Sequence, residues 1–314
     1  MHIHTPEHLQ LTMQACGLSE AGDVRSHNED RFVVDTALGL VAVADGMGGH
    51  MSGEIASTAA LAALVGSLRQ QPPACAASAS ATASATAPAT APAGAPAGAL
   101  DTTSDGESPS DPDATDVDQR WHSIAQLRRV VACVNTLLYQ ENCAHGHAEG
   151  NGMGSTLTGL RFLPGAGAVV SFHVGDSRLY RFRAGVLVQL TRDQTAYQLA
   201  LESSAPGPLP PTNLLLQAIG PAPQVTPEFA YHQVLAGDLF LLCSDGLHGW
   251  VPHAQIDALL RRDDALGAAC AGLLALARQY ASRDNVTALL ARFDGLARLE
   301  KSGVNRASDR ARPA

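Results

Sequence analysis

Four aspartates stand at the edges of apolar, strand-like runs. Asp45, Asp176 and Asp245 follow residues 40–44, 172–175 and 239–244, and Asp284 precedes the run that starts at residue 285. A β-sheet can bring the ends of its strands together, however far apart they lie in sequence. Carboxylates that converge without matching Lys or Arg repel one another strongly, and a bound divalent metal removes that repulsion. Ligands that are all oxygen suit Mg²⁺ or Mn²⁺ better than Zn²⁺.

Asp45 is the aspartate with the most informative context. A carboxylate at such a position can bridge two metals, and Gly46 would let its own backbone carbonyl approach one of them closely. The alternative is a simple Asp-Gly turn, which is common. The chain supplies its own comparisons in Asp105-Gly106 and Asp294-Gly295. Neither has both a flanking apolar strand and a glycine-rich continuation, so the sequence favours the metal role for Asp45.

The order of these segments resembles the metal-dependent protein phosphatase family, protein phosphatase type 2C, in its bacterial form. The resemblance runs over roughly residues 15–294, is interrupted once, and rests on motifs at 22–30, 45–50, 53–54, 152–156, 175–178, 190–193, 237–238, 244–246 and 284–285. One of these motifs alone would be a weak signal, whereas all of them in family order make a strong one.

The resemblance implies further metal ligands. Asp245 and Asp284 match direct ligands of the first metal, and Asp176, with Asp245, matches a residue that supports a third, weaker metal. Each has a plain alternative, because Asp284-Asn285 is also typical of a helix-to-strand turn and Asp176-Ser177 of a turn at a strand end.

The resemblance also implies roles for the motif Arg25-x-x-Asn28-Glu29-Asp30. Glu29 and Asp30 would hold metal-bound waters, and Arg25 would grip the substrate phosphate, since its planar fork can bind two phosphate oxygens at once. The alternative for Arg25 is a surface salt bridge with Glu29.

The expected activity is hydrolysis of phosphoserine and phosphothreonine on proteins by a metal-activated water. Two divalent metals, Mn²⁺ or Mg²⁺, would lower the pKa of a bridging water to near neutrality, and the motifs of phosphatases with a cysteine nucleophile are missing from the sequence. The protein substrates would be products of a bacterial Ser/Thr kinase. The alternative function is a catalytically weak relative that binds phosphoproteins in a signalling pathway.

Net charge, cysteine spacing and the length of apolar runs argue against several other classes of function. The net charge of −9 argues against nucleic acid as a partner, because phosphate contacts need clustered Lys and Arg. The six cysteines show no CxxC or CxH spacing, which argues against a zinc site and fits a reducing cytoplasm. No signal peptide and no apolar run of the ~20 residues of a membrane helix is visible. We therefore expect a cytoplasmic monomer without a membrane anchor.

Residues 72–118 form a compositional break, rich first in Ala, Ser, Thr and Pro and then in Asp, Ser and Pro. Almost nothing large and apolar is present to bury there, so we expect a disordered insert. The motifs lie on both sides of it, which predicts one catalytic domain over 12–295 and a polar tail over 296–314. The insert is either a tether or docking segment, or a tolerated loop.

Strand-like runs come in blocks and helix-like runs in pairs, which indicates an α+β fold. Strands are expected near 31–36, 39–44, 155–163, 167–174, 177–183, 186–190, 225–234, 238–243 and 285–293, and helices near 52–70, 120–142, 253–262 and 264–281. Residues 183–185 read as a hairpin turn. The family resemblance sharpens the fold to an antiparallel β-sandwich with pairs of helices on both outer faces, in four α-β-β-α layers.

Overall fold

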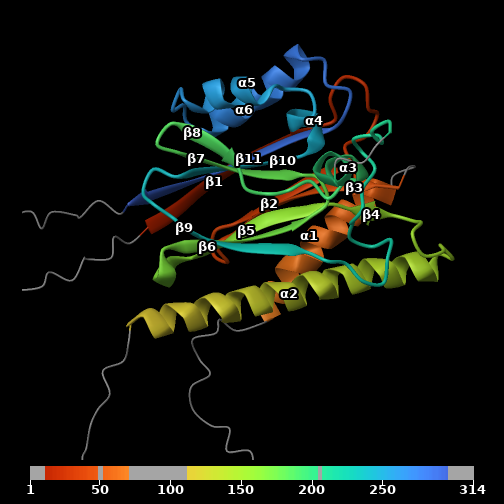
Figure 1. Ribbon diagram of the computed structural model, residues 1–314, viewed down its shortest axis with the longest axis horizontal. Helices are drawn as coiled ribbons and strands as arrows, with labels where there is room; N and C mark the ends of the chain where they lie inside the picture. The colour runs from red at the N-terminus through yellow and green to blue at the C-terminus, as the bar shows by residue number, and fades with distance from the viewer. Residues whose placement is uncertain (1–10, 49–51, 71–111, 204–206, 296–314) are drawn as a thin grey trace, which may run out of the picture.

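Two antiparallel sheets stack face to face, and helices cover the outer face of each sheet (Figure 1). The computed structural model describes residues 11–48, 52–70, 112–203 and 207–295. Both termini, residues 49–51 and 204–206, and most of the segment that was expected to be an insert lie outside these ranges.

The first sheet has five strands in the order β1-β11-β10-β7-β8. Their bounds are β1 Leu11–Glu20, β7 Arg178–Arg183, β8 Val186–Gln189, β10 Leu239–Cys243 and β11 Val286–Gly295. The N-terminal strand β1 pairs along its full length with the C-terminal strand β11, from Leu11 opposite Gly295 to Glu20 opposite Val286. The two ends of the domain are therefore joined in one sheet.

The second sheet follows the order β2-β3-β5-β6-β9, and a short strand β4 pairs with the end of β3. Its strands are β2 Asp30–Asp35, β3 Leu40–Met47, β4 Gly154–Ser155, β5 Leu157–Leu163, β6 Ala168–Val174 and β9 Glu228–Gln233. Asp30 and Asp45 lie directly opposite each other in the β2–β3 pair.

Two helices cover each outer face. The second sheet carries α1 Ser52–Gln70 and α2 Pro112–Ala144, and the first carries α5 His253–Leu260 and α6 Leu266–Gln279. Shorter elements are α3 Ala196–Ser203, α4 Asp245–His248 and a 3₁₀ turn, Pro164–Ala166. In the described ranges, we find no helix with the length and apolar content that a membrane span requires.

The side chains of the strands alternate between the two faces of each sheet, so the buried apolar residues form three layers. Along β3, Val41 and Val43 pack between the two sheets, while Leu40, Ala42 and Ala44 pack against α1 and α2. A third cluster fills the space between the first sheet and helices α5 and α6. Because successive side chains of a strand point to opposite faces, a strand buried on both faces reads as a continuous apolar run. The four-layer sandwich expected from the family resemblance is confirmed.

The predicted hairpin turn is confirmed, since Ala184 and Gly185 both have positive φ, at 47° and 78°. Such a two-residue turn matches the twist of the strands that it joins. β7 and β8 pair around it, with Arg183 opposite Val186.

Several elements differ from the sequence-based expectation. Strand β1 was not predicted, because its residues alternate poorly and are half-buried or exposed throughout. Helices α3 and α4 were not predicted either. Helix α2 begins at Pro112, so residues 112–118 are helical rather than disordered. Proline is favoured in the first turn of a helix, where its missing N–H has no partner to lose. Residues 72–111 lie outside the described residues, and their disorder stays a prediction.

Candidate metal centre

The candidate site lies between the two sheets, at the end of the sandwich where apolar side chains give way to polar ones. In four strands, the side chains that face the other sheet are apolar along the strand, and the next side chain on that face, at this end of the sandwich, is polar. Asp45 follows Val41 and Val43, Asp30 precedes Phe32 and Val34, Ser244 follows Phe240 and Leu242, and Thr287 precedes Leu289 and Ala291. The period of two along each strand therefore directs these four side chains into one space.

Asp30 is the most deeply buried carboxylate of the group, with 1% of its surface exposed. Its Oδ2 accepts hydrogen bonds from Ser244 Oγ at 2.6 Å and Thr287 Oγ1 at 2.7 Å. These hydroxyls come from the opposite sheet, so Asp30 ties the two sheets together. Its Oδ1 is buried and has no hydrogen-bond partner. Burial raises the pKa of Asp30 to about 7, against the two hydrogen bonds and with the help of the negative charges of Asp245 and Asp284.

Asp45 and Asp245 lie beside Asp30, Asp45 directly across the β2–β3 pair and Asp245 as the first residue of α4. Burial raises the pKa of Asp45 well above its ordinary value, and the charges of Asp30, Asp245, Asp176 and Asp284 raise it further, in that order. Burial and then Asp284 raise the pKa of Asp245 to about 6, against a hydrogen bond with Asp45. These shifts share two physical causes, of which burial is the larger and the negative charge of the neighbouring aspartates is the second.

Asp176 belongs to the same group. It follows β6 and has 7% of its surface exposed. Burial raises its pKa to about 7, and the charges of Asp245 and Asp193 raise it further. The backbone carbonyl of Asp176 lies 3.0 Å from Nε2 of His248, at the end of α4.

Gly46 occupies a position that a side chain could not share. A Cβ atom there would lie 2.0 Å from the carbonyl oxygen of Gly53 and 2.8 Å from that of Glu29. The Gly46 N–H donates to the Glu29 carbonyl at 3.2 Å, and the adjacent Asp45 N–H donates to Thr156 Oγ1 at 2.9 Å. The backbone that carries Asp45 is therefore fixed on both sides.

Arg25 lies at the exposed rim of the site. Its Nη2 donates to Asp284 Oδ2 at 2.8 Å, with 52% and 32% of the two side chains exposed. The hydrogen bond to Asp284 raises the pKa of Arg25. The alternative raised from sequence, a salt bridge between Arg25 and Glu29, is not what the structure shows, because Asp284 is the partner.

Three polar residues of the site had no role in the sequence interpretation. Ser244 and Thr287 hold Asp30, and Asn285 fixes the loop that carries Arg25. The Asn285 amide donates to the carbonyls of Ala21 and His27 at 3.0 and 2.8 Å, and its Oδ1 accepts from the Glu29 N–H at 2.8 Å. The sequence did contain a signal for these residues, because each is a polar residue within or next to an otherwise apolar strand.

All eight residues proposed from sequence lie at this end of the sandwich or on the loops that line it. They are Arg25, Glu29, Asp30, Asp45, Gly46, Asp176, Asp245 and Asp284. His50, whose role the sequence left open, lies outside the described residues.

The donor set fits divalent cations that prefer oxygen. Five aspartates gather with one exposed arginine beside them, and the buried Oδ1 of Asp30 has no partner. Among the described residues, no group of three His, Cys, Asp or Glu side chains is arranged so that it could hold a metal ion by itself. Mg²⁺ is usually held by one or two carboxylates and keeps several waters, so an open site of this kind suits it and Mn²⁺ better than Zn²⁺.

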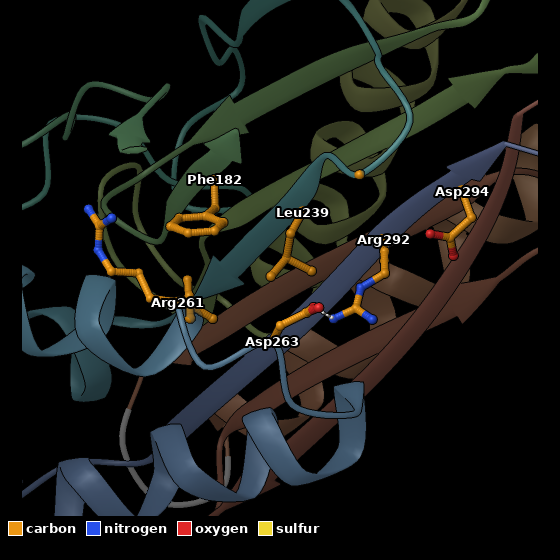
Figure 2. Close-up of a pocket in the computed structure, with 8 residues that line it drawn as sticks. Phe182, Leu239, Arg261, Asp263, Arg292 and Asp294 are labelled. Atoms are coloured by element: carbon orange, nitrogen blue, oxygen red, sulfur yellow. Dashed lines mark hydrogen bonds and ion pairs between the residues drawn. The ribbon is translucent and has the colours of Figure 1, made fainter. Parts of the chain in front are cut away.

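A cavity elsewhere lies at the opposite end of the first sheet, where Leu239 pairs with Arg292 (Figure 2). It has a volume of about 320 Å³. Figure 2 shows Arg292 pointing to Asp263, with which it forms an ion pair of 3.1 Å. Arg261, also in its wall, is paired with Asp257 at 2.8 Å. Both arginines of this cavity therefore already have acidic partners.

Comparison with known proteins agrees with this geometry. The family model described as protein phosphatase 2C matches residues 23–291. The serine/threonine protein phosphatase PstP of Mycobacterium tuberculosis is 29% identical over 286 residues, which cover 90% of this chain and 45% of PstP. The chain thus spans about half the length of that relative. The serine/threonine phosphatase stp of Listeria monocytogenes is also 29% identical, over 88% of this chain and 94% of its own length.

Two solved structures have the same fold. PppA, described as a key regulatory component of T6SS in Pseudomonas aeruginosa, is 29% identical with a TM-score of 0.66, over 90% of this chain and 98% of PppA. The catalytic domain of PstP, solved in complex with two manganese ions, is 27% identical with a TM-score of 0.66, over 90% of this chain and 99% of that domain.

Proposed function

The chain belongs to the protein phosphatase 2C family, and from that premise we propose that it hydrolyses phosphoserine and phosphothreonine on proteins with a metal-activated water. The observation that carries the proposal is the group of five aspartates gathered between the sheets with a single exposed arginine beside them. A group of this kind raises the pKa of its own members, and divalent cations remove that cost. No observation favours the alternative of a catalytically weak phosphoprotein binder.

We assign the metal ligands as follows. Asp45, Asp245, Asp284 and the Gly46 carbonyl would hold two divalent metals, Mn²⁺ or Mg²⁺, and Asp176 with Asp245 would support a weaker third. Glu29 and Asp30 would hold metal-bound waters, and the unpartnered Oδ1 of Asp30 is the acceptor that supports this role. When bound, such metals lower the pKa of a coordinated water and so supply hydroxide near neutral pH.

Arg25 would bind the phosphoryl group. Its guanidinium lies at the rim, where a phosphorylated side chain can reach it, and it already holds a carboxylate, that of Asp284, at 2.8 Å. A guanidinium fork offers parallel donors to two phosphoryl oxygens and offsets their charge as the phosphorus is attacked. If Asp284 binds metal, its hold on Arg25 weakens and these donors become free for substrate.

The substrate and setting follow from this chemistry. The phosphoproteins would come from a bacterial Ser/Thr kinase, since only phosphoryl transfer to a hydroxyl makes such esters. The five cysteines in the described residues are free thiols, which supports a reducing cytoplasm as the location. We propose a monomer, which size-exclusion chromatography with light scattering can test.

The experiment is a phosphate-release assay with the full chain, Mn²⁺, and matched phosphothreonine and phosphotyrosine peptides. We expect turnover of the phosphothreonine peptide and a preference for it. Asp45→Asn should reduce turnover to a few per cent or less. The matched control is Asp294→Asn, a second Asp-Gly pair at the far end of β11, which should keep full activity. Equal losses in the two variants, or no turnover in the wild type, would overturn the assignment.

A further inference from the structure

His248 has no role in the proposed chemistry, yet it connects two of the aspartates. It is the last residue of the four-residue helix α4, and Asp245 is the first. Its Nε2 lies 3.0 Å from the backbone carbonyl oxygen of Asp176, which follows β6. A carbonyl oxygen can only accept a hydrogen bond, so Nε2 carries a proton and donates it. Helix α4 therefore supplies a carboxylate at its start and a donor to a second aspartate at its end.

Helix α4 is held firmly by its surroundings. Figure 1 shows it at the end of the first sheet, next to β10. Leu247 is fully buried, and the carbonyl of Gly246 accepts a hydrogen bond from Ser282 Oγ at 2.8 Å. A Cβ atom on Gly246 would lie 1.9 Å from the carbonyl oxygen of Asn285, so the helix backbone packs directly on the residue before β11. The first and last residues of α4 are thus carried by one firmly packed turn.

The backbone on either side of Asp176 is held by other parts of the chain. Gly175 exchanges two hydrogen bonds with Gln194, at 2.8 and 3.0 Å. Ser177 Oγ lies 2.8 Å from Thr156 Oγ1. The carbonyl of Asp176 itself accepts from the imidazole at the end of α4. Because α4 follows a strand of the first sheet and Asp176 follows a strand of the second, this hydrogen bond connects the two sheets at the metal centre.

The other ring nitrogen of His248 argues against a purely structural role. Its Nδ1 is buried and has no hydrogen-bond partner. A buried polar atom without a partner costs stability, so an apolar side chain of similar size would serve the packing of α4 better. What the histidine adds to this position is its donor to Asp176.

We propose that His248 is a positioning residue, which fixes the carboxylate of Asp176 relative to that of Asp245. The inference rests on the proposed function, in which these two aspartates support the weaker third metal, and it names the residue that sets their separation. Mg²⁺ demands oxygen ligands at about 2.1 Å in nearly octahedral geometry, so a small shift of one carboxylate weakens its binding.

The test measures Mn²⁺ binding to the full chain without substrate, by electron paramagnetic resonance of the free ion. His248→Leu removes the donor, and we expect the weakest Mn²⁺ dissociation constant to rise about tenfold, as when a group that orients a metal ligand is lost. The tighter constants should stay unchanged. Two polar variants form a matched pair. His248→Gln should bind Mn²⁺ nearly as the wild type does, because its amide nitrogen can reach the position of Nε2. His248→Asn is one methylene shorter and should behave like His248→Leu.

A double-mutant cycle separates positioning from general support of the fold. Asp176→Asn should weaken the same Mn²⁺ constant, and His248→Leu should add nothing to that loss, because both changes act through one carboxylate. The control is His232→Leu, which removes a half-buried histidine on β9 that contacts Ser171 Oγ at 3.2 Å. It should leave every Mn²⁺ constant unchanged. Melting temperatures in EDTA will show which variants are folded, and the Gln and Asn pair decides the outcome if His248→Leu is not.

The inference is overturned if the weakest constant is the same in His248→Asn as in His248→Gln, or if the losses in the double variant add. It is also overturned if the wild type binds no third Mn²⁺. In each of these cases, hydrolysis of a phosphothreonine peptide by the wild type would leave the proposed function in place. Failure of the wild type to hydrolyse any phosphate ester would instead overturn the proposed function, whatever the Mn²⁺ constants show.

Discussion

Replacement of Asp30 by Asn tests the electrostatic reasoning directly, because it should stabilise the metal-free protein. Asp30 is 1% exposed, and burial raises its pKa from 3.8 to about 7. Asn is nearly isosteric, stays neutral at every pH, and retains one oxygen that can accept the hydrogen bonds of Ser244 and Thr287. The substitution therefore removes a buried charge and leaves the link between the sheets in place.

The sign and size of the effect follow from linkage. Because the folded protein holds the Asp30 proton more tightly than the unfolded chain does, the wild type loses stability as the pH rises from about 4 to about 7. A difference of about three pKa units corresponds to about 4 kcal/mol. This value is an upper limit, because Asp30, Asp45 and Asp245 affect one another's pKa and the shift does not belong to Asp30 alone. In EDTA at pH 7.5 or so, Asp30→Asn should thus be more stable than the wild type by up to ~4 kcal/mol, and the difference should vanish near pH 4.

The assay is urea unfolding in EDTA at a series of pH values. Asp238→Asn is the control, because Asp238 is equally buried at 1% exposure but is paired with Arg183. Its loss leaves a guanidinium without its partner and should destabilise the protein. The reasoning is refuted if Asp30→Asn is as destabilising as Asp238→Asn, or if its stability relative to the wild type does not change with pH.

Three further predictions concern the metal, the arginine and the segment before α2. EDTA should abolish activity and Mn²⁺ should restore it, while Zn²⁺ alone should not; activity after exhaustive chelation, or equal recovery with Zn²⁺, would contradict an open site of oxygen ligands. Arg25→Lys should lower kcat/KM for a phosphopeptide at least tenfold, because lysine cannot make the bidentate contact with the phosphoryl group. It should change the free energy of unfolding by less than about 1 kcal/mol, because the ion pair between Arg25 and Asp284 is exposed. Urea unfolding and peptide kinetics measure the two effects, and a large stability loss with normal kinetics would assign Arg25 a structural role. Deletion of residues 76–110, which leaves α2 whole, should leave p-nitrophenyl phosphate hydrolysis nearly unchanged, because loop length affects stability only logarithmically; a marked loss of turnover or of folding would show that the segment packs on the domain.

The sequence by itself determined the candidate residues of the metal centre. Asp45, Asp176, Asp245 and Asp284 could be singled out because each stands at the edge of an apolar run, which is a local feature of the chain, and the order of the motifs, through the family resemblance, implied the metal roles of Asp176, Asp245 and Asp284. The apolar run 39–44 also predicted a strand, and β3 is that strand; its burial on both faces became clear only from the structure. Strand β1 escaped prediction because its stability comes from pairing with β11, from Leu11 opposite Gly295 to Glu20 opposite Val286, and not from its own pattern.

Tertiary structure alone decided how these residues are held. Asp30 meets Ser244 and Thr287 across 214 and 257 positions of sequence, and Arg25 meets Asp284 across 259. Such contacts depend on the register of the strands and on how the two sheets stack, and no local periodicity encodes either. The exposure of Leu199 and Leu216 is likewise decided by the tertiary structure, since an apolar residue in a sequence is expected to be buried until the packing around it is known.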